Sequence, residues 1–547
     1  MVAGWNIMFC LAVTLAFVTA ENDSGKGVVK LSSGAELHGE QSQEGGTTAF
    51  YGIKYGTAGR FEHAKPNTDF AYLKDPNRVK QGYVCPHFPM NIPGFPTRKL
   101  DMNEDCLYLD VYVPPSDKEK AEARPVFFWI YGGGFKMGDK DMYNATILAK
   151  AIDAVVVTVN YRLSVFGFLS TGDEAAPGNW AISDLKVALN WTLDNIAAFG
   201  GDPKKITISG ESAGGALTSA LMLDDDVRHK VKAGIAFSGS ILSGWAVVKD
   251  PKAIALTLAA SLGCSNATTA EAVACLKGMQ YEVLLNGTKA LEDKTDKAQM
   301  GMHFTPVVDG SHIAKLPADI LLERAAKEDK SSEENAGKLI TGYLREDAAM
   351  FTLFIAPQAL LDNATHNYSS ALKMLTMHSI GMTKGKCPPD VVAKNAKAAF
   401  DFYKISESVT SDEALNAYHM IASDLMFGVS AMKESMMYAN ISEKANQMFL
   451  ITFNPGFRRL GAFHFMEVLH LFRGVLDAMM KEKMSEAFTK TISDYVHQIV
   501  YNGHYDGPFF GREGNYQEID QDSKVVNKKI EFAKTQLLED MLHCRNT

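Results

Sequence analysis

The sequence lacks several features that would point to particular classes of protein. It has no internal repeat, no low-complexity linker and, after its first twenty residues, no apolar segment long enough to span a bilayer. Basic residues are not in excess, because 55 Lys and Arg stand against 64 Asp and Glu and give a net charge of -9. This balance argues against nucleic acid or an anionic membrane as the main partner.

Metal and cofactor signatures are also missing. The 14 histidines show no metal-ligand spacing, and no Cys-x-x-Cys pair occurs among the seven cysteines. We therefore expect no metal and no organic cofactor.

What is present is an ordinary globular composition over 547 residues, with 46% hydrophobic and 22% charged residues. This length suits one large α/β domain or several smaller ones. The first twenty residues read as a secretory signal, because Ile7–Val18 is mostly apolar and small residues precede Glu21. We predict a signal peptide over 1–20 and a single domain over 21–547, exported from the cell.

Export makes disulfides and glycans relevant. Six cysteines follow the signal, and six allow fifteen connectivities; the short spacing of Cys264 and Cys275 favours a local loop. Asn-x-Ser/Thr sequons also occur at Asn22 and Asn190. The candidate glycosylation sites are Asn144, Asn266, Asn286, Asn363, Asn367 and Asn440.

Apolar runs alternate with helical patterns along the middle of the chain. Strands are predicted at Thr48–Tyr55, Cys106–Val113, Pro125–Tyr131, Ala154–Asn160, Gly234–Ser238, Lys338–Thr341 and Met448–Phe453. A helix is predicted over Asp184–Phe199, and the region from about 310 to 445 is otherwise helical and expected to cover the sheet. Fully apolar strands alternating with helices predict a mostly parallel sheet with both faces covered.

One short stretch carries the chemistry. Ile206–Ser209 is an apolar strand pattern, and Gly210-Glu-Ser212-Ala-Gly214 follows it as a G-x-S-x-G. This order predicts a sharp turn from strand to helix with Ser212 at its apex. Chance supplies such a pattern in roughly one chain in four of this length, so the pattern alone does not identify a nucleophile. A nucleophilic serine also needs a base and an acid that orients the base.

Candidates for both occur later, in the order that an α/β-hydrolase requires. Glu346 and Asp347 follow the strand at Lys338–Thr341, and His464 follows the strand at Met448–Phe453. Either carboxylate could orient the histidine on this evidence alone.

With these residues in place, the chain resembles the type-B carboxylesterases, the cholinesterase-like group of the α/β-hydrolase superfamily. The resemblance covers nearly the whole chain after the signal. It rests on Phe50–Tyr55, Arg60-Phe61, Glu104–Tyr112, Trp129–Phe135, Asn160–Leu163, Phe199–Pro203, Gly210–Gly214, Phe304–Gly310 and Gly461–Glu467.

The resemblance assigns roles. It implies an α/β-hydrolase fold, a nucleophile at Ser212 and a general base at His464. The family's acid stands five residues after the strand-end glycine, Gly342, which favours Asp347 over Glu346. The remaining assignments are an oxyanion hole at Gly133, Gly134 and Ala213, pocket residues at Glu211 and Trp245, an acid-supporting hydroxyl at Ser238, structural residues at Arg162 and Asp184, and disulfides Cys85–Cys106 and Cys264–Cys275. Cys387 and Cys544 are left, either paired together or with Cys544 joining two subunits.

The expected function is hydrolysis of uncharged carboxylic esters. The loop between Cys85 and Cys106 has no Trp, where cholinesterases carry the aromatic residue that faces choline, so choline esters are not expected. Two alternatives stay open: a non-catalytic adhesion or scaffold protein on the same fold, which usually lacks the triad, and a lipase. A monomer and a homodimer are both compatible with the sequence.

Overall fold

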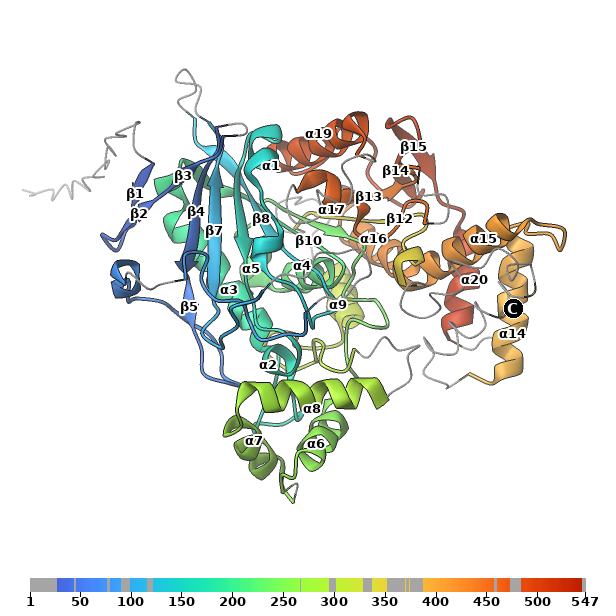
Figure 1. The fold of residues 1–547 in the computed structure, drawn as a ribbon. Helices are drawn as coiled ribbons and strands as arrows, with labels where there is room; N and C mark the ends of the chain where they lie inside the picture. Colours follow the sequence, from blue (N-terminus) through green and yellow to red (C-terminus); the bar gives the residue numbers. More distant parts are fainter. Residues whose placement is uncertain are drawn as a thin grey trace, which may run out of the picture.

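A large mixed sheet lies at the centre of the computed structural model (Figure 1). Within the described residues it has eleven strands, in the order β15-β14-β13-β12-β11-β10-β8-β9-β7-β4-β3. The structure describes residues 27–43, 46–75, 79–89, 99–115, 122–265, 267–294, 302–327, 337–351, 369, 373, 387–456, 460–472 and 484–543. The predicted signal segment lies outside these ranges.

Parallel strands form the middle of the sheet. They are β8 (Arg124–Ile130), β9 (Val155–Val159), β10 (Gly201–Glu211), β11 (Ala233–Phe237), β12 (Leu339–Leu344), β13 (Asn446–Ile451) and β14 (Asn515–Ile519). The edges are antiparallel: β3 (Glu40–Gln41), β4 (Thr48–Lys54) and β7 (Tyr108–Val113) on one side, β15 (Val525–Lys529) on the other. Two short hairpins stand apart, β1 (Val28–Lys30) with β2 (Glu36–His38) and β5 (Gly56–Thr57) with β6 (Lys65–Pro66).

Helices pack against the sheet and extend beyond it. Helices in contact with the central strands include α3 (Trp180–Asn195), α4 (Ala213–Leu223), α16 (Val429–Ile441) and α19 (Glu486–Asn502). A cluster of α6 (Pro251–Ser261), α7 (Thr269–Lys277) and α8 (Tyr281–Lys294) lies at the bottom of Figure 1, and α14 (Pro389–Phe402), α15 (Ser411–Ser423) and α20 (Phe532–Leu542) lie at the right. The other helices are α1 (Thr146–Ala151), α2 (Ser164–Phe168), α5 (Asp225–Arg228), α9 (Pro317–Lys327) and α17 (Met466–Leu471).

The predicted strands all occur, with ends that differ by a few residues. The predicted helix start at Asp184 is wrong, because α3 begins at Trp180, directly after Asn179 in a left-handed conformation with φ 56°. Its last predicted turn, Ile196–Phe199, is a 3-10 helix that ends at Gly200. The hairpin β14–β15 was not predicted, because its strands are short and rich in polar residues.

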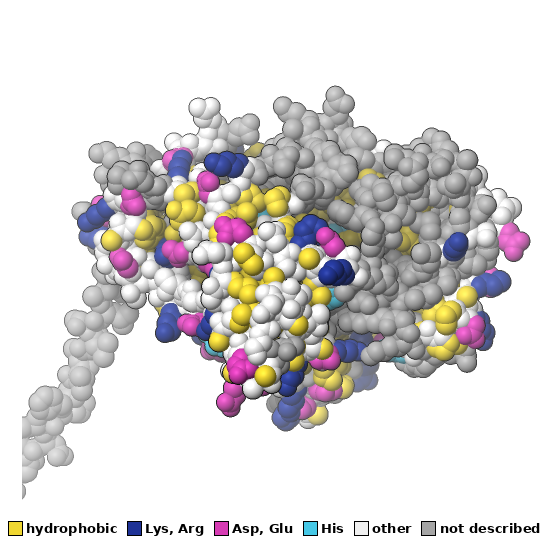
Figure 2. Space-filling view, turned by 60° about the horizontal axis from the view of Figure 1, so that its bottom comes forward, with side chains coloured by type: hydrophobic (Ala, Val, Ile, Leu, Met, Phe, Trp, Pro, Cys, Tyr) yellow, Lys and Arg dark blue, Asp and Glu magenta, His cyan; other side chains and the backbone are white. Residues whose placement is uncertain are grey.

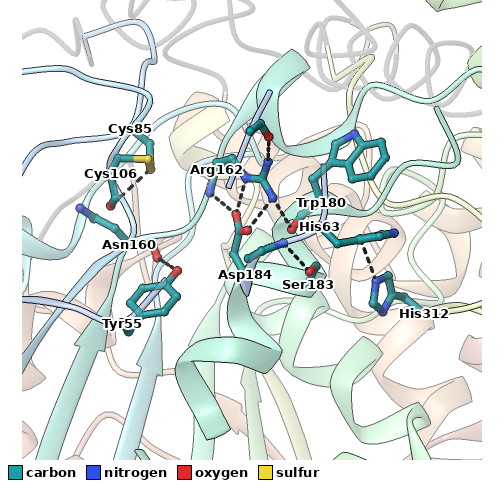
Figure 3. Close-up of polar contacts among 12 residues, drawn as sticks. Tyr55, His63, Cys85, Cys106, Asn160, Arg162, Trp180, Ser183, Asp184 and His312 are labelled. Atoms are coloured by element: carbon teal, nitrogen blue, oxygen red, sulfur yellow. Dashed lines mark hydrogen bonds and ion pairs between the residues drawn. A yellow bond between two sulfur atoms is a disulfide. The ribbon is translucent and has the colours of Figure 1, made fainter. Parts of the chain in front are cut away.

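A buried ion pair supports the loop after β9 (Figure 3). The guanidinium of Arg162 donates to both carboxylate oxygens of Asp184 at 2.7 and 2.8 Å, and its NH1 group donates to the carbonyl of Gly59. Nearby, the hydroxyl of Tyr55 donates to the carbonyl of Asn160 at 2.7 Å. These contacts join the segment after β4 to the loop at the carboxyl end of β9.

The structure forms both disulfides that the resemblance implied. Cys85 is bonded to Cys106 and Cys264 to Cys275. Cys387 is also disulfide-bonded, and Cys544 lies outside the described residues.

The sequons differ in exposure. Asn190, Asn286 and Asn440 are exposed, whereas Asn144 is half-buried and its side-chain oxygen accepts from the N–H of Thr146 at 3.0 Å. The sequons at Asn22, Asn266, Asn363 and Asn367 lie outside the described residues.

The surface carries both signs of charge. On the face turned forward in Figure 2, Lys and Arg side chains are intermixed with Asp and Glu side chains. Among the described helices, none combines the length and the apolar character needed to cross a bilayer.

Candidate active site

Ser212 occupies the sharp turn that the sequence predicts. Strand β10 ends at Glu211, helix α4 begins at Ala213, and Ser212 between them has φ 56° and ψ -122°. Its N–H donates to the carbonyl of Phe237 at the end of β11, at 2.8 Å. A non-glycine residue in this conformation costs on the order of 1–3 kcal/mol, and the surrounding contacts must hold it there.

A glycine loop lies against this turn. Gly133 and Gly134 follow β8 and have φ values of 106° and 62°, which favour glycine. A Cβ atom on Gly132 would lie 2.9 Å from the Cβ atom of Ser212, so the loop and the serine are in close contact. The N–H of Ala213 is the first of α4 and has no partner within the helix. The three N–H groups predicted as an oxyanion hole therefore come from elements that meet at Ser212.

Asp347 is the carboxylate that contacts His464. Its Oδ1 lies 2.7 Å from His464 Nδ1, and its Oδ2 accepts from the hydroxyl of Ser238 at 2.7 Å and the N–H of Leu344 at 2.9 Å. Asp347 is fully buried. Three donors thus fix both of its oxygens, and the carboxylate can fix the tautomer of the imidazole in turn.

The side chain of Glu346 accepts hydrogen bonds from residues other than the histidine. Its Oε2 accepts from the N–H of Ala462 at 2.9 Å, and its Oε1 accepts from Arg345 Nε at 2.6 Å. The side chain ties the loop after β12 to the loop that carries His464. Of the two carboxylates that the sequence left open, only Asp347 reaches the histidine.

The second nitrogen of His464 faces Glu211. His464 Nε2 lies 3.0 Å from Glu211 Oε1, and both side chains are buried. Within the described part of the chain, the Ser212 hydroxyl makes no hydrogen bond to this nitrogen. The arrangement therefore differs from the expected serine–histidine contact, since a carboxylate attracts the imidazole more strongly than a neutral hydroxyl does.

Two carboxylates shift the titration of the histidine. Burial lowers the pKa of His464, but the charges of Glu211 and Asp347 outweigh burial and hold this pKa well above its usual range. Burial raises the pKa of Glu211, and the nearby imidazolium opposes that shift. A strongly perturbed group in a cluster of this kind marks a candidate functional site.

Glu467 was part of a motif in the sequence, but no role was inferred for it. It is fully buried on α17, and neither of its carboxyl oxygens accepts a hydrogen bond from another residue in the described part of the chain. Burial, with the charges of Glu211 and Asp347, raises the pKa of Glu467 well above its usual range. The protonated form of Glu467 is therefore favoured up to a higher pH than that of an exposed glutamic acid.

Aromatic rings surround the imidazole. Phe427 stacks on the His464 ring with centroids 4.9 Å apart, and Phe351 lies 5.0 Å from it. Trp245, the predicted pocket residue, is half-buried against Phe427 and Phe135, each at 6.0 Å, and its Nε1 donates to the carbonyl of Met426. No sequence pattern pointed to Phe427, because it lies within a long helical pattern.

No group of three or more His, Cys, Asp or Glu side chains within the described ranges is placed to hold a metal ion.

Comparison with known proteins decides the family. A model of the carboxylesterase family matches residues 26–538. The chain belongs to the carboxylesterase family. Its eleven-stranded sheet with flanking helices is accordingly an α/β-hydrolase fold, as the sequence predicted.

Mammalian carboxylesterases are among the similar proteins. The chain is 40% identical over 230 residues to carboxylesterase 1E of Mus musculus and 41% identical over 230 residues to liver carboxylesterase of Sus scrofa. It is 37% identical over 278 residues to liver carboxylesterase 1 of Oryctolagus cuniculus. These matches cover 41%, 41% and 48% of this chain and 41%, 40% and 49% of the relatives. The chain thus spans less than half of the length of each of these carboxylesterases.

Proposed function

We propose that the protein hydrolyses uncharged carboxylic esters with Ser212 as nucleophile, His464 as general base and Asp347 as the orienting acid. The observation that carries the proposal is the 2.7 Å contact between Asp347 and His464 beside the strained Ser212 turn. The family and its similar mammalian carboxylesterases support the same activity.

The reaction proceeds in two halves. His464 takes the proton of the Ser212 hydroxyl as its oxygen attacks the ester carbonyl, and Asp347 stabilises the imidazolium. The N–H groups of Gly133, Gly134 and Ala213 stabilise the oxyanion, and His464 returns the proton to the leaving alcohol. Water activated by His464 then hydrolyses the acyl-enzyme.

The contact of His464 Nε2 with Glu211 describes the site without substrate. Catalytic hydrogen bonds are often long or absent in that state and form in the Michaelis complex. In the Michaelis complex, His464 Nε2 accepts the hydrogen bond of the hydroxyl of Ser212, the residue directly after Glu211. Glu211 then remains beside the imidazolium and stabilises it.

We also propose that the chain is exported as a single catalytic domain over 21–547 after loss of residues 1–20, and that its exposed sequons are glycosylated. Disulfides Cys85–Cys106 and Cys264–Cys275 support export, because such bonds persist in oxidising compartments. After expression in secreting cells, the protein should be found in the culture medium and should begin at Glu21. Its mass should fall after treatment with an N-glycosidase, and a protein retained in the cells with its first residues intact would contradict this part.

The activity is tested by hydrolysis of a short-chain aryl ester. The wild-type protein should turn the ester over, and Ser212→Ala should lose at least about 10⁴-fold in kcat. Ser209→Ala is the matched control: Ser209 is buried on the same strand, and its hydroxyl has no partner in the described structure. Activity that survives in Ser212→Ala would exclude this mechanism.

A further inference from the structure

A π-helical turn interrupts the long helix beside the site. Residues Asp424–Gly428 form this turn between α15 and α16. Its five residues are buried. A π turn is less stable than an α turn and is frequently found at functional sites, because the widened turn redirects side chains. Among the side chains of this turn, Phe427 reaches the imidazole of His464.

The first residue of the turn is held by three donors. The Asp424 carboxylate accepts from the hydroxyls of Tyr343 and Tyr403, and Lys534 Nζ lies 2.7 Å from its Oδ2. Tyr343 belongs to β12, four residues before Asp347, so the anchor starts from the strand that carries the acid. These contacts fix where the turn begins.

The last residue of the turn must be glycine for this anchor to form. A Cβ atom on Gly428 would lie 2.8 Å from Tyr343 Cζ and 3.0 Å from Asp424 Oδ1. The backbone of the turn therefore lies directly against the hydrogen bond between these two side chains. This close approach links the shape of the turn to the anchor.

The same segment contacts His464 and the residue that follows Asp347. The hydroxyl of Ser423, just before the turn, accepts from the N–H of Ala348, the residue after Asp347, at 2.8 Å. Phe427 stacks on the His464 ring with an interplanar angle of 23°. On its other side, the carbonyl of Met426 accepts from Trp245 Nε1 at 3.1 Å.

We propose that the turn Asp424–Gly428 is a positioning element that holds the ring of Phe427 against the imidazole of His464 and so fixes the orientation of the base. This inference rests on the proposed function, and it makes Phe427 and Asp424 positioning residues. An aromatic face within about 6 Å also favours the cationic form of the imidazole. Phe427 therefore supports the imidazolium that forms while Ser212 attacks.

The groups that face His464 come from three elements. Asp347 follows β12 and Glu211 ends β10. Burial raises the pKa of Glu467 on α17, and the charge of the imidazolium opposes that rise. The carboxylate of Asp424 is directed instead to Tyr343, Tyr403 and Lys534. From the turn itself, the imidazole is faced by the ring of Phe427 and not by a charge.

The test compares Phe427→Leu with Phe510→Leu. Both phenylalanines are buried in the same hydrophobic cluster, and only Phe427 contacts the imidazole. In Phe427→Leu, the acid limb of kcat/KM should move to lower pH by about 0.5 to 1 unit. kcat should fall about three- to tenfold, by the same factor for esters with different acyl chains. Phe510→Leu should leave the pH profile in place.

A second variant and a second readout keep the test independent of activity. Tyr403→Phe removes one hydroxyl from Asp424 without opening a cavity, and it should shift the profile in the same direction by a smaller amount. The downfield proton resonance of the His464 Nδ1–H group reports the titration of His464 directly. This titration should move to lower pH in Phe427→Leu and less in Tyr403→Phe.

The outcomes separate the two proposals. If the resonance titrates at a lower pH in Phe427→Leu while the wild-type protein hydrolyses no ester, the positioning role holds and the proposed function fails. If the wild type hydrolyses esters but the titration and acid limb of Phe427→Leu match the wild type, the positioning role is wrong. A loss that depends on the acyl chain, without a pH shift, or an equal shift in Phe510→Leu, also overturns it.

Discussion

Asp347 Oδ1 lies 2.7 Å from His464 Nδ1 although 117 residues separate the two in the chain. Strands β12 and β13 are parallel neighbours, and each residue lies in the loop that follows one of them. Two distant loops thus meet at the carboxyl edge of the sheet, where ligands of such sheets bind. Because Asp347 contacts the histidine, we expect its substitution to lower kcat more than substitution of the adjacent Glu346.

Asp347→Asn should lower kcat about 10⁴-fold, because the amide cannot hold the reactive tautomer or stabilise the imidazolium. Glu346→Gln should lower kcat less than about tenfold, because Glu346 contacts Arg345 and Ala462 rather than the histidine. Steady-state kinetics on one aryl ester compares the two variants. A larger loss of kcat in Glu346→Gln than in Asp347→Asn would show that Glu346, and not Asp347, is the acid.

Glu211→Gln should move the acid limb of kcat/KM to lower pH. The ionised carboxylate beside Nε2 raises the pKa of His464, so the imidazole is protonated and inactive up to a higher pH. Removing an opposite charge at this distance lowers a pKa by about 1 to 3 units. The pH dependence of kcat/KM measures the shift, with Glu346→Gln as the matched acidic control. An acid limb that stays in place or moves upward would contradict this role of Glu211.

Gly133→Ala should lower kcat by at least about 10²-fold. A Cβ atom at this position would lie 2.1 Å from the carbonyl oxygen of Met137, so the loop must move and its N–H groups leave the oxyanion position. Gly200→Ala is the control, because Gly200 also has a positive φ but open space around it. Both variants should lose about 1 kcal/mol or more of stability, and only Gly133→Ala should lose turnover. Equal kinetic losses would show that the loop plays no special part.

Glu434→Gln should change how stability depends on pH. Glu434 is fully buried on α16, and burial raises its pKa from 4.5 to about 7, although the hydroxyl of Ser219 donates to it. The folded state therefore binds a proton that the unfolded state releases, and stability falls as pH rises from about 4.5 to about 7. The loss is on the order of 3 kcal/mol.

Thermal unfolding at pH 5.5 and pH 8 measures this effect. The variant should gain stability relative to the wild type as pH rises, because Gln cannot ionise. Glu292 has a similarly raised pKa of about 7 and adds the same trend to both proteins. A difference in Tm between variant and wild type that is the same at both pH values would contradict the prediction.

The sequence predicted those parts of the site that depend on local patterns. The turn at Ser212 follows from a strand and flanking glycines, and Gly133 and Gly134 were assigned by their match to the family pattern. The position of Asp347 followed from its distance to Gly342 in the family pattern. In each case a few adjacent residues determine the local backbone, so the turn and the loops could be placed from the sequence, while their catalytic roles stay predictions.

Other features depend on packing between distant segments. The contact of Glu211 with His464 is a choice between two partners for one nitrogen, which no pattern of residues encodes. The π turn at Asp424–Gly428 has the same apolar spacing as an α-helix, and its anchors come from three other elements. The hairpin β14–β15 is stabilised by pairing with β13 rather than by its own apolar residues.

The central claim is that Ser212 is the nucleophile activated by His464. Treatment with a phosphonylating aryl ester followed by peptide mass spectrometry measures this directly. We expect one phosphonyl group per chain, located on Ser212, with loss of ester hydrolysis in proportion to labelling and no labelling in Ser212→Ala. A group found on another residue, or full labelling with hydrolysis unchanged, would contradict the account.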